Sequence, residues 1–175
     1  MKNWKFAITI ISIALLTVWV GCSGEAGIKK TEAENMATVR YVHSELVNGN
    51  YDVFDEVLAP NYIRHCQAMP PELWEMTDPA ILKSFVSEFF ESSSDYSETI
   101  DLMMAEGDKV AYILTMKGVQ TGPMAGLLAT GKEYTIVNLV IQRFEDSKIA
   151  ETWVSWDNVA MLTQLGFFPP PSSEK

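Results

Sequence analysis

The strongest constraint on the fold is an alternation of side-chain character near the end of the chain, which gives two segments two distinct faces. It runs through residues 134–144 and 149–157, with a short acidic segment at 145–147 between them. Period-two alternation is typical of β-strands that have two distinct faces. Two such strands this close in sequence predict a long hairpin, which needs a curved sheet and a covering helix to be stable.

The turn of this hairpin decides which side chains share a face. A three-residue turn at 145–147, followed by a bulge, groups Ile136, Asn138, Val140, Gln142, Ala150, Thr152, Val154 and Trp156. Ser147 would then take a position that favours glycine, at a cost of about 1 kcal/mol. A two-residue turn at Asp146 and Ser147 would instead place Glu151, Trp153, Ser155 and Asp157 beside Asn138 and Val140.

The preceding part of the chain contains three stretches of helical periodicity and three stretches that resemble strands. Helices are expected over 31–47, 51–58 and 79–90, and strands over 61–65, 96–105 and 109–119. With the hairpin and a short helix after Asp157, this order predicts an α+β fold with one antiparallel sheet. The segment 66–79 is a long loop of the kind that covers a pocket.

The N-terminus has the pattern of an export signal. Two lysines precede an apolar run of fifteen residues at 6–20, which is shorter than the ~20 residues of a membrane span. Small residues before Cys22 resemble a bacterial lipoprotein processing site, although Trp19 stands where leucine is usual. We therefore expect lipidation of Cys22 and a place in the cell envelope, held to the membrane only by the lipid. A plain cleaved signal peptide and an uncleaved anchor are the alternatives.

These signals divide the chain into four parts. We expect a signal peptide at 1–21, a tether at 22–31, a single domain at 32–167 and a disordered tail at 168–175. Residues 1–21 carry two of the 13 basic residues and no acidic one, so the remainder has 11 basic against 23 acidic side chains, a net charge of −12. This charge argues against nucleic acid and anionic lipid headgroups as partners.

The cysteines and histidines argue against a metal site. The two histidines stand alone, without the paired Cys/His spacing of a metal site. If Cys22 carries lipid, Cys66 is a single thiol; a Cys22–Cys66 disulfide is the less favoured alternative.

Several short motifs occur in an order that resembles a known family. They are Asn50-Tyr51, Pro60-Asn61-Tyr62-Ile63-Arg64-His65, Ala105-Glu106-Gly107-Asp108-Lys109-Val110, Gly118-Val119-Gln120-Thr121-Gly122, Gly131-Lys132, and Arg143-Phe144 followed by Asp146-Ser147-Lys148-Ile149. The series is similar to the SnoaL-like polyketide and ester cyclases of the nuclear transport factor 2-like superfamily. The resemblance implies a cone-shaped, barrel-like curved sheet covered by three N-terminal helices, around one small-molecule pocket. It also favours the three-residue turn.

The resemblance implies cofactor-free acid–base chemistry, with two departures. The family's pocket aspartate commonly lies three residues before the residue matched by Arg143, where this chain has Val140. A histidine is frequent where this chain has Thr152. We therefore expect a largely apolar pocket without a carboxylate at its floor, with Asn138 and Thr152 as polar groups and Trp156 at one end.

His65 and Asp157 are the candidates for moving protons. Histidine exchanges protons near neutral pH, and His65 ends a strand beside the long loop. A hydrogen bond to backbone is the alternative role for His65. Asp157 precedes a short helix, so it could instead be the N-cap of that helix.

Further candidates could contact a ligand. His43 lies on the apolar stripe of the first helix, and therefore faces either the core or the pocket. Gln120 could bind a ligand carbonyl or lie in solvent at a strand end. Trp74 and Trp156 could form adaptable apolar surface or belong to the core.

Two functions remain open on this reading. One is an enzyme that acts on a small apolar carbonyl compound. The other is a lipoprotein that holds an apolar molecule in the same pocket without changing it. Either could form a homodimer through the outer face of the sheet.

Overall fold

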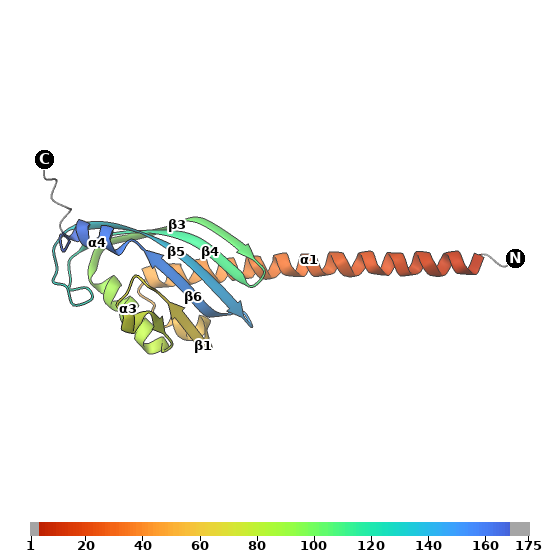
Figure 1. Ribbon diagram of the computed structural model, residues 1–175, viewed down its shortest axis with the longest axis horizontal. Helices are drawn as coiled ribbons and strands as arrows, with labels where there is room; N and C mark the ends of the chain where they lie inside the picture. Colours follow the sequence, from red (N-terminus) through yellow and green to blue (C-terminus); the bar gives the residue numbers. More distant parts are fainter. Residues whose placement is uncertain (1–3, 169–175) are drawn as a thin grey trace.

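The structure, a computed structural model, describes the backbone of residues 4–168 and the side chains of residues 25–168. The elements in chain order are α1 (Trp4–Val47), α2 (Val53–Val57), β1 (Leu58–His65), η1 (Pro71–Leu73), β2 (Glu75–Met76), α3 (Pro79–Glu91), β3 (Ser93–Glu106), β4 (Lys109–Gln120), β5 (Glu133–Glu145), β6 (Lys148–Trp156) and α4 (Asn158–Leu165). The expected α+β class is confirmed, with three helices before the long strands and a short one at the end (Figure 1).

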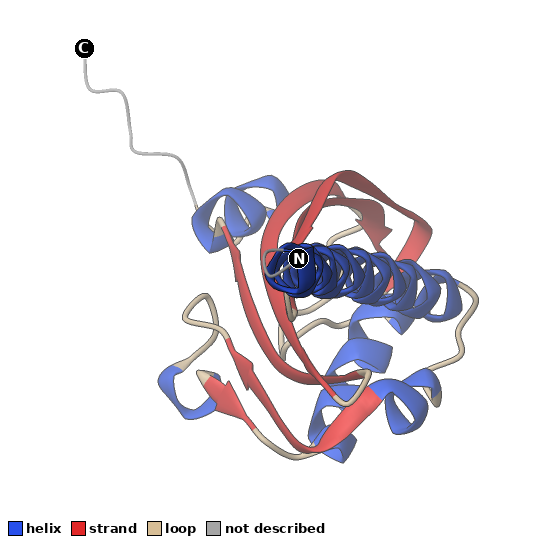
Figure 2. Cartoon of the chain, turned by 90° about the vertical axis from the view of Figure 1, so that its right-hand side faces the viewer, coloured by secondary structure: helices blue, strands red, loops and turns tan. Residues whose placement is uncertain are grey.

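The six strands form one curved sheet in the order β2-β1-β6-β5-β4-β3. The sheet was expected to be antiparallel, and every neighbouring pair is antiparallel except β1 and β6, which are parallel. A parallel pair requires a long connection, and the whole segment from β2 to β5 separates these two strands in the chain. The sheet curves around one end of α1 without closing (Figure 2).

The helix α1 is much longer than the expected 31–47. Its last turns pack on β3 and β4 through Val39, Val42 and Leu46, which are buried at helical spacing. The predicted cap at Thr31 is not used; instead, the Thr31 hydroxyl donates to the Gly27 carbonyl within the helix. The helix therefore continues towards the N-terminus, beyond the sheet (Figure 1).

The expected tether at 22–31 is thus helical. Its described side chains, 25–31, are exposed. Ion pairs one turn apart, Lys29–Glu25 at 3.1 Å and Lys30–Glu34 at 3.7 Å, support the helix there. Within the residues whose side chains are described, no helix has the length and apolar character needed to cross a membrane.

Three expectations lie wholly or partly outside the described residues. The signal peptide at 1–21 and the Cys22 thiol have no described side chains, and residues 169–175 of the expected tail are outside the structure. Cys66 is a buried free thiol at the end of β1. Its backbone N–H donates to the Trp74 carbonyl at 2.8 Å, which folds the 66–79 segment back onto the sheet.

The terminal hairpin has the expected face but a different turn. Glu145 pairs with Lys148, so the turn has two residues, Asp146 and Ser147, both with positive φ (49° and 64°). Such a turn matches the twist of the flanking strands. The register then shifts by one residue at Ala150, because Arg143 pairs with Glu151 whereas Phe144 pairs with Ile149. A two-residue turn without a bulge would have turned Glu151 and Trp153 inwards. The bulge shifts the strand by one residue, so that Thr152 and Val154 face inwards instead.

Inward-facing side chains therefore form successive rows across the sheet. One row contains Arg64, Thr152 and Gln142, which are direct neighbours on β1, β6 and β5. The next row contains Val154, Val140 and Tyr112, and the one after it contains Trp156, Asn138 and Leu114. These rows form the concave surface on which the candidate site is built.

Candidate functional site

The concave face of the sheet and the helices enclose a cavity of about 360 Å³. This volume is at the small end of the range for ligand pockets. Strands β1 and β3 to β6 contribute its floor, and α1, α2, α3 and α4 contribute its walls. Two loops complete it, with Met69 from the 66–79 segment and Met124 from the segment between β4 and β5.

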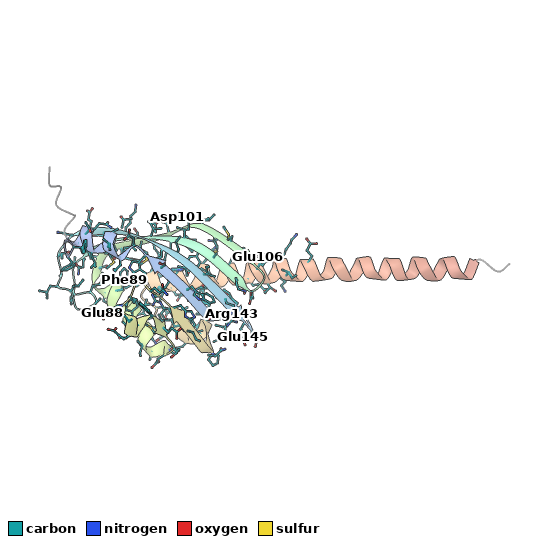
Figure 3. All side chains as sticks on the ribbon, in the orientation of Figure 1. Glu88, Phe89, Asp101, Glu106, Arg143 and Glu145 are labelled. Atoms are coloured by element: carbon teal, nitrogen blue, oxygen red, sulfur yellow. The ribbon has the colours of Figure 1, made fainter. Side chains whose placement is uncertain are left out.

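The second of these loops is tied to α3. The carboxylate of Glu88 accepts a hydrogen bond from the backbone N–H of Ala125 at 3.1 Å. Glu88 and the neighbouring Phe89, both on α3 and both labelled in Figure 3, line the cavity. The rim of the cavity is therefore joined to a rigid element.

A chain of hydrogen bonds crosses one wall of the cavity. His43 Nδ1 lies 2.8 Å from Glu98 Oε1, and His43 Nε2 lies 3.1 Å from the Tyr112 hydroxyl. The other Glu98 oxygen accepts from the Tyr96 hydroxyl at 2.6 Å. A carboxylate on Nδ1 selects the tautomer with the proton there, which leaves Nε2 as the acceptor of the tyrosine O–H.

The local sequence explains how these groups meet. His43 follows Val39 and Val42 on the buried stripe of α1. Tyr112 is on the inward face of β4, where alternate residues are buried. Glu98 pairs with Met116 on β4 and shares its inward face. Burial raises the pKa of the Tyr112 phenol, and burial followed by the charge of Glu98 raises that of Tyr96, so both stay protonated at neutral pH.

Glu98 corrects the expectation of a pocket without a carboxylate. The side chain of Glu98 is only 7% exposed and lines the cavity. We based the expectation on the terminal hairpin, and the inward residues of the hairpin carry no carboxylate. The carboxylate in the cavity comes from β3. Sequence reasoning missed Glu98 because it assigned no face to the strand 96–105.

The terminal hairpin contributes the expected residues to the floor. Asn138, Val140, Thr152 and Trp156 all line the cavity. The amide nitrogen of Asn138 lies 2.7 Å from the Met116 sulfur, a weak acceptor. The Thr152 hydroxyl and the Trp156 indole N–H are buried without a partner among the described residues.

Arg64 is a further polar group of the cavity that the sequence analysis missed. Its side chain is buried, and its Nη1 has no hydrogen-bond partner among the described residues. The guanidinium carbon lies 5.5 Å from the centre of the Phe85 ring. Burial raises the pKa of the nearby Tyr62 phenol, and the close Thr152 hydroxyl, followed by the positive charge of Arg64, acts in the opposite direction.

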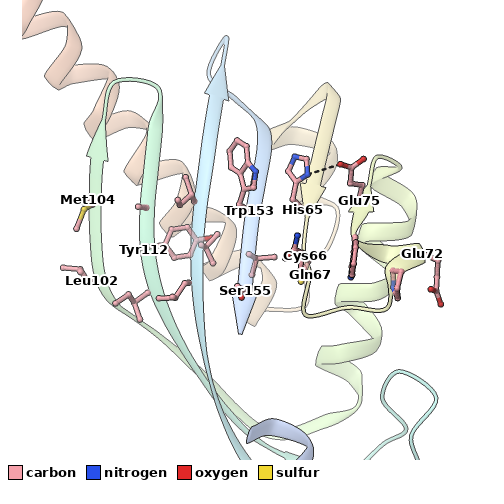
Figure 4. A pocket seen from close by; sticks show the side chains of 18 residues that line it. His65, Cys66, Gln67, Glu72, Glu75, Leu102, Met104, Tyr112, Trp153 and Ser155 are labelled. Carbon is pink, nitrogen blue, oxygen red and sulfur yellow. Dashed lines mark ion pairs between the residues drawn. The ribbon is translucent and has the colours of Figure 1, made fainter. Parts of the chain in front are cut away.

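His65 and Trp74 lie away from this cavity, on the outer face of the sheet. His65 stacks on Trp153 with ring centres 5.3 Å apart, and its Nδ1 lies 3.6 Å from Glu75 Oε1 (Figure 4). Its Nε2 lies 3.0 Å from Glu151 Oε1. The Trp74 indole donates to the Met69 carbonyl at 2.8 Å. Both residues line an open hollow of about 850 Å³ over the outer face. Neither meets the polar chain around His43.

Asp157 and Gln120 take part in local structure. Asp157 is the N-cap of α4, where its Oδ1 accepts from the Ala160 N–H at 2.9 Å. Gln120 is fully buried, accepts from the Thr130 hydroxyl at 2.7 Å and donates to the Leu128 carbonyl at 3.3 Å. It thus holds the loop between β4 and β5 and does not line the cavity.

A metal site would need several clustered ligands. Among the residues whose side chains are described, no group of three or more His, Cys, Asp or Glu side chains could hold a metal ion.

Comparison with known families identifies the chain. The model of the SnoaL-like polyketide cyclases matches residues 37–165, so the chain belongs to this family. A search among curated proteins found no significant match.

Solved structures share the fold. TsrD from Streptomyces laurentii is 23% identical with a TM-score of 0.68, over 78% of this chain and 98% of its own. A protein from Jannaschia sp. CCS1, assigned as a SnoaL-like polyketide cyclase, is 21% identical with a TM-score of 0.69, over 79% and 95%. An epoxide hydrolase of the LEH-like type from M. tuberculosis is 13% identical with a TM-score of 0.59, over 77% and 90%. At these identities the likeness shows the fold alone.

Proposed function

We propose that this chain is a cofactor-free enzyme that moves a proton next to the carbonyl of a small apolar compound, in a cyclase or isomerase reaction. The observation that carries the proposal is the Glu98–His43–Tyr112 chain inside the cavity, with contacts of 2.8 and 3.1 Å. A histidine held by a carboxylate on one nitrogen and free to accept a proton on the other is a general base.

Tyr112 is the member of the chain that touches the ligand. Its hydroxyl takes the proton from the carbon beside the carbonyl while its own proton passes to His43 Nε2. The electron pair of the C–H bond becomes the enolate, and the Glu98 carboxylate balances the positive charge on His43. Since burial raises the pKa of Tyr112, the two transfers are concerted and no free phenolate forms.

The enolate oxygen needs hydrogen-bond donors. The Trp156 indole N–H is buried without a partner, and Asn138 is its direct neighbour across β5 and β6. Both lie one row from Tyr112 on the concave face. Preorganised donors in an enclosed site stabilise a developing negative charge more than water does. In a ring closure the enolate carbon attacks a second carbonyl, whose π electrons move to its oxygen, and the proton held by His43 returns through Tyr112 to that alkoxide. In an isomerisation the same proton returns to a different carbon of the enolate.

Exchange of α-protons tests this proposal without knowledge of the natural substrate. The protein is incubated with 2-tetralone in D₂O, and loss of the α-proton signal is followed by NMR. Wild type should exceed the buffer rate, and His43→Asn should lose about 100-fold of the added rate, which is typical for a general base. His65→Asn is the matched control and should behave like wild type. Equal rates for wild type and His43→Asn would contradict the proposal.

A binding protein without turnover is the second candidate. Val140 and Thr152 favour it, because they stand where the family commonly has acid–base residues. Its signature would be binding of 2-tetralone in the cavity with exchange no faster than in buffer, for wild type and His43→Asn alike.

We also propose that the chain is exported and held in the cell envelope by a lipid on Cys22. The apolar run at 6–20 and the small residues before Cys22 support this. Mass spectrometry of the N-terminal peptide from the native host tests it. A diacylated Cys22 peptide is expected, and an unmodified peptide that still begins at Met1 would contradict it.

A further inference from the structure

We infer that Arg64 binds the carboxylate of the ligand, so that the natural ligand is an apolar acid, such as a keto acid. This inference rests on the proposed function only in that the cavity must be a ligand site. It adds the chemical class of the ligand and the direction in which the ligand lies.

The first observation is the state of the guanidinium. Arg64 is 7% exposed and lines the cavity, and its Nη1 is buried without a hydrogen-bond partner among the described residues. The guanidinium lies over the Phe85 ring, and an aromatic ring cannot accept from the N–H donors in the plane of the guanidinium. A buried N–H without an acceptor is unfavourable, so we expect a hydrogen-bond acceptor from outside the chain at Nη1.

The second observation is that the acidic groups of the cavity are already engaged. Glu98 bonds to His43 and Tyr96 through its two oxygens. Glu88 accepts from the backbone of Ala125 at the rim. Within the described side chains, no carboxylate forms an ion pair with Arg64. The charge of the guanidinium is therefore available to an anion that enters the cavity.

The third observation is the row in which Arg64 lies. Its neighbours across the sheet are Thr152 and Gln142, and both also have a buried side-chain atom without a partner. The Thr152 hydroxyl can donate to a carboxylate oxygen, and the unpartnered atom of Gln142 is its amide oxygen, which accepts. Arg64 and Thr152, neighbours on β1 and β6, therefore both present donors to an anion, whereas the unpartnered Oε1 of Gln142 suits a donor on the ligand.

The position of this row orients the ligand. Tyr112 and Val140 belong to the next inward row, which is two residues further along the strands. That spacing corresponds to about 7 Å. When the carboxylate of the ligand is bound at Arg64, the carbon that lies next to Tyr112 is therefore several bonds away from that carboxylate. The acid group itself does not react.

Two inert probes with the same apolar body test the inference. Binding of 2-naphthoate and of methyl 2-naphthoate is measured by calorimetry for wild type, Arg64→Met and the surface control Arg40→Met. We expect Arg64→Met to weaken 2-naphthoate binding by about 10- to 100-fold, the usual range for a charge-assisted hydrogen bond, and to leave the ester within about threefold. Arg40→Met should change neither affinity.

The outcomes separate the two proposals. If wild type binds the ester and 2-naphthoate equally and Arg64→Met changes neither, the anion site is refuted and the cavity stands. If neither probe binds wild type, the ligand cavity and the anion site both fail. Thermal melting of ligand-free Arg64→Met provides a second readout. Its melting temperature should equal or exceed that of wild type, because an unpaired charge is removed, and a marked fall would show a structural role instead.

Discussion

Arg64 and His65 are consecutive residues that serve opposite faces of the sheet. Because side chains alternate along a strand, Arg64 points into the cavity and His65 stacks on Trp153 outside it. A search for titratable groups favours His65, since arginine does not exchange protons near neutral pH. Because of this alternation, Arg64 belongs to the proposed site and His65 does not.

The residues of the floor were predictable from period-two alternation together with the family resemblance, which selected between the two possible faces. Asn138, Val140, Thr152 and Trp156 lie on the expected face. Glu98 and Tyr112 were not predicted as site residues. Their roles depend on contact with His43, which is 55 residues from Glu98 and 69 from Tyr112. No local pattern encodes a contact over such a separation.

Asp157 gives a prediction at the scale of a single residue. Its carboxylate caps α4, so Asp157→Ala should lower the free energy of unfolding by about 1 kcal/mol, as is typical for loss of an N-cap. Asp157→Asn should be nearly neutral, because asparagine caps about as well. Urea denaturation of both variants measures this. Equal losses in the two variants would contradict a capping role.

At the scale of elements, the bulge at Ala150 determines what the terminal hairpin presents to the cavity. The sequence predicted the face correctly through a three-residue turn, whereas the chain reaches the same face with a two-residue turn and a bulge. A three-residue turn and a two-residue turn followed by a bulge turn the same residues of β6 inwards. The identity of the inward residues therefore does not reveal the turn. The start of α1 was missed for a different reason, because the Thr31 hydroxyl donates to the Gly27 carbonyl within the helix and does not cap it.

The hairpin also carries a cross-strand ion pair, which predicts a pH dependence of stability. Arg143 Nε donates to Glu151 Oε2 at 2.9 Å. This hydrogen bond, opposed by burial and assisted by His65, lowers the pKa of Glu151 below its ordinary 4.5. A lowered pKa stabilises the fold above the ordinary value, and the contribution is lost as pH falls through the lowered value.

The comparison of wild type with Glu151→Gln tests this dependence. The difference in free energy of unfolding between them should be full at about pH 6 and should shrink as the pH falls below about 4.5. In an Arg143→Met background the same substitution should show a much weaker pH dependence. A difference that stays constant down to about pH 3 would contradict the assignment.

At the scale of the whole molecule, the outer face of the sheet is apolar and open. Met104, Leu139 and Ile141 are 56%, 58% and 45% exposed on β3 and β5, and they border the outer hollow. Exposed apolar patches of this kind are typical of interaction surfaces. We propose that a second copy of the chain covers this face, as a homodimer.

Analytical ultracentrifugation of residues 25–175 tests the dimer. Wild type should sediment as a dimer, and Leu139→Glu should be monomeric because it places a charge in the buried contact. Val159→Glu, at a similarly exposed apolar position on α4, is the control and should stay dimeric. A monomeric wild type would exclude this homodimer.

The most direct test of the account asks which of the two hollows holds a ligand. Val140 and Leu139 are consecutive on β5, and they face the inner cavity and the outer face respectively. Calorimetry with methyl 2-naphthoate compares Val140→Phe, which fills the cavity, with Leu139→Phe, which adds the same ring outside it. The account predicts that Val140→Phe abolishes binding and that Leu139→Phe binds like wild type. Loss of binding in Leu139→Phe, with full binding in Val140→Phe, would contradict it.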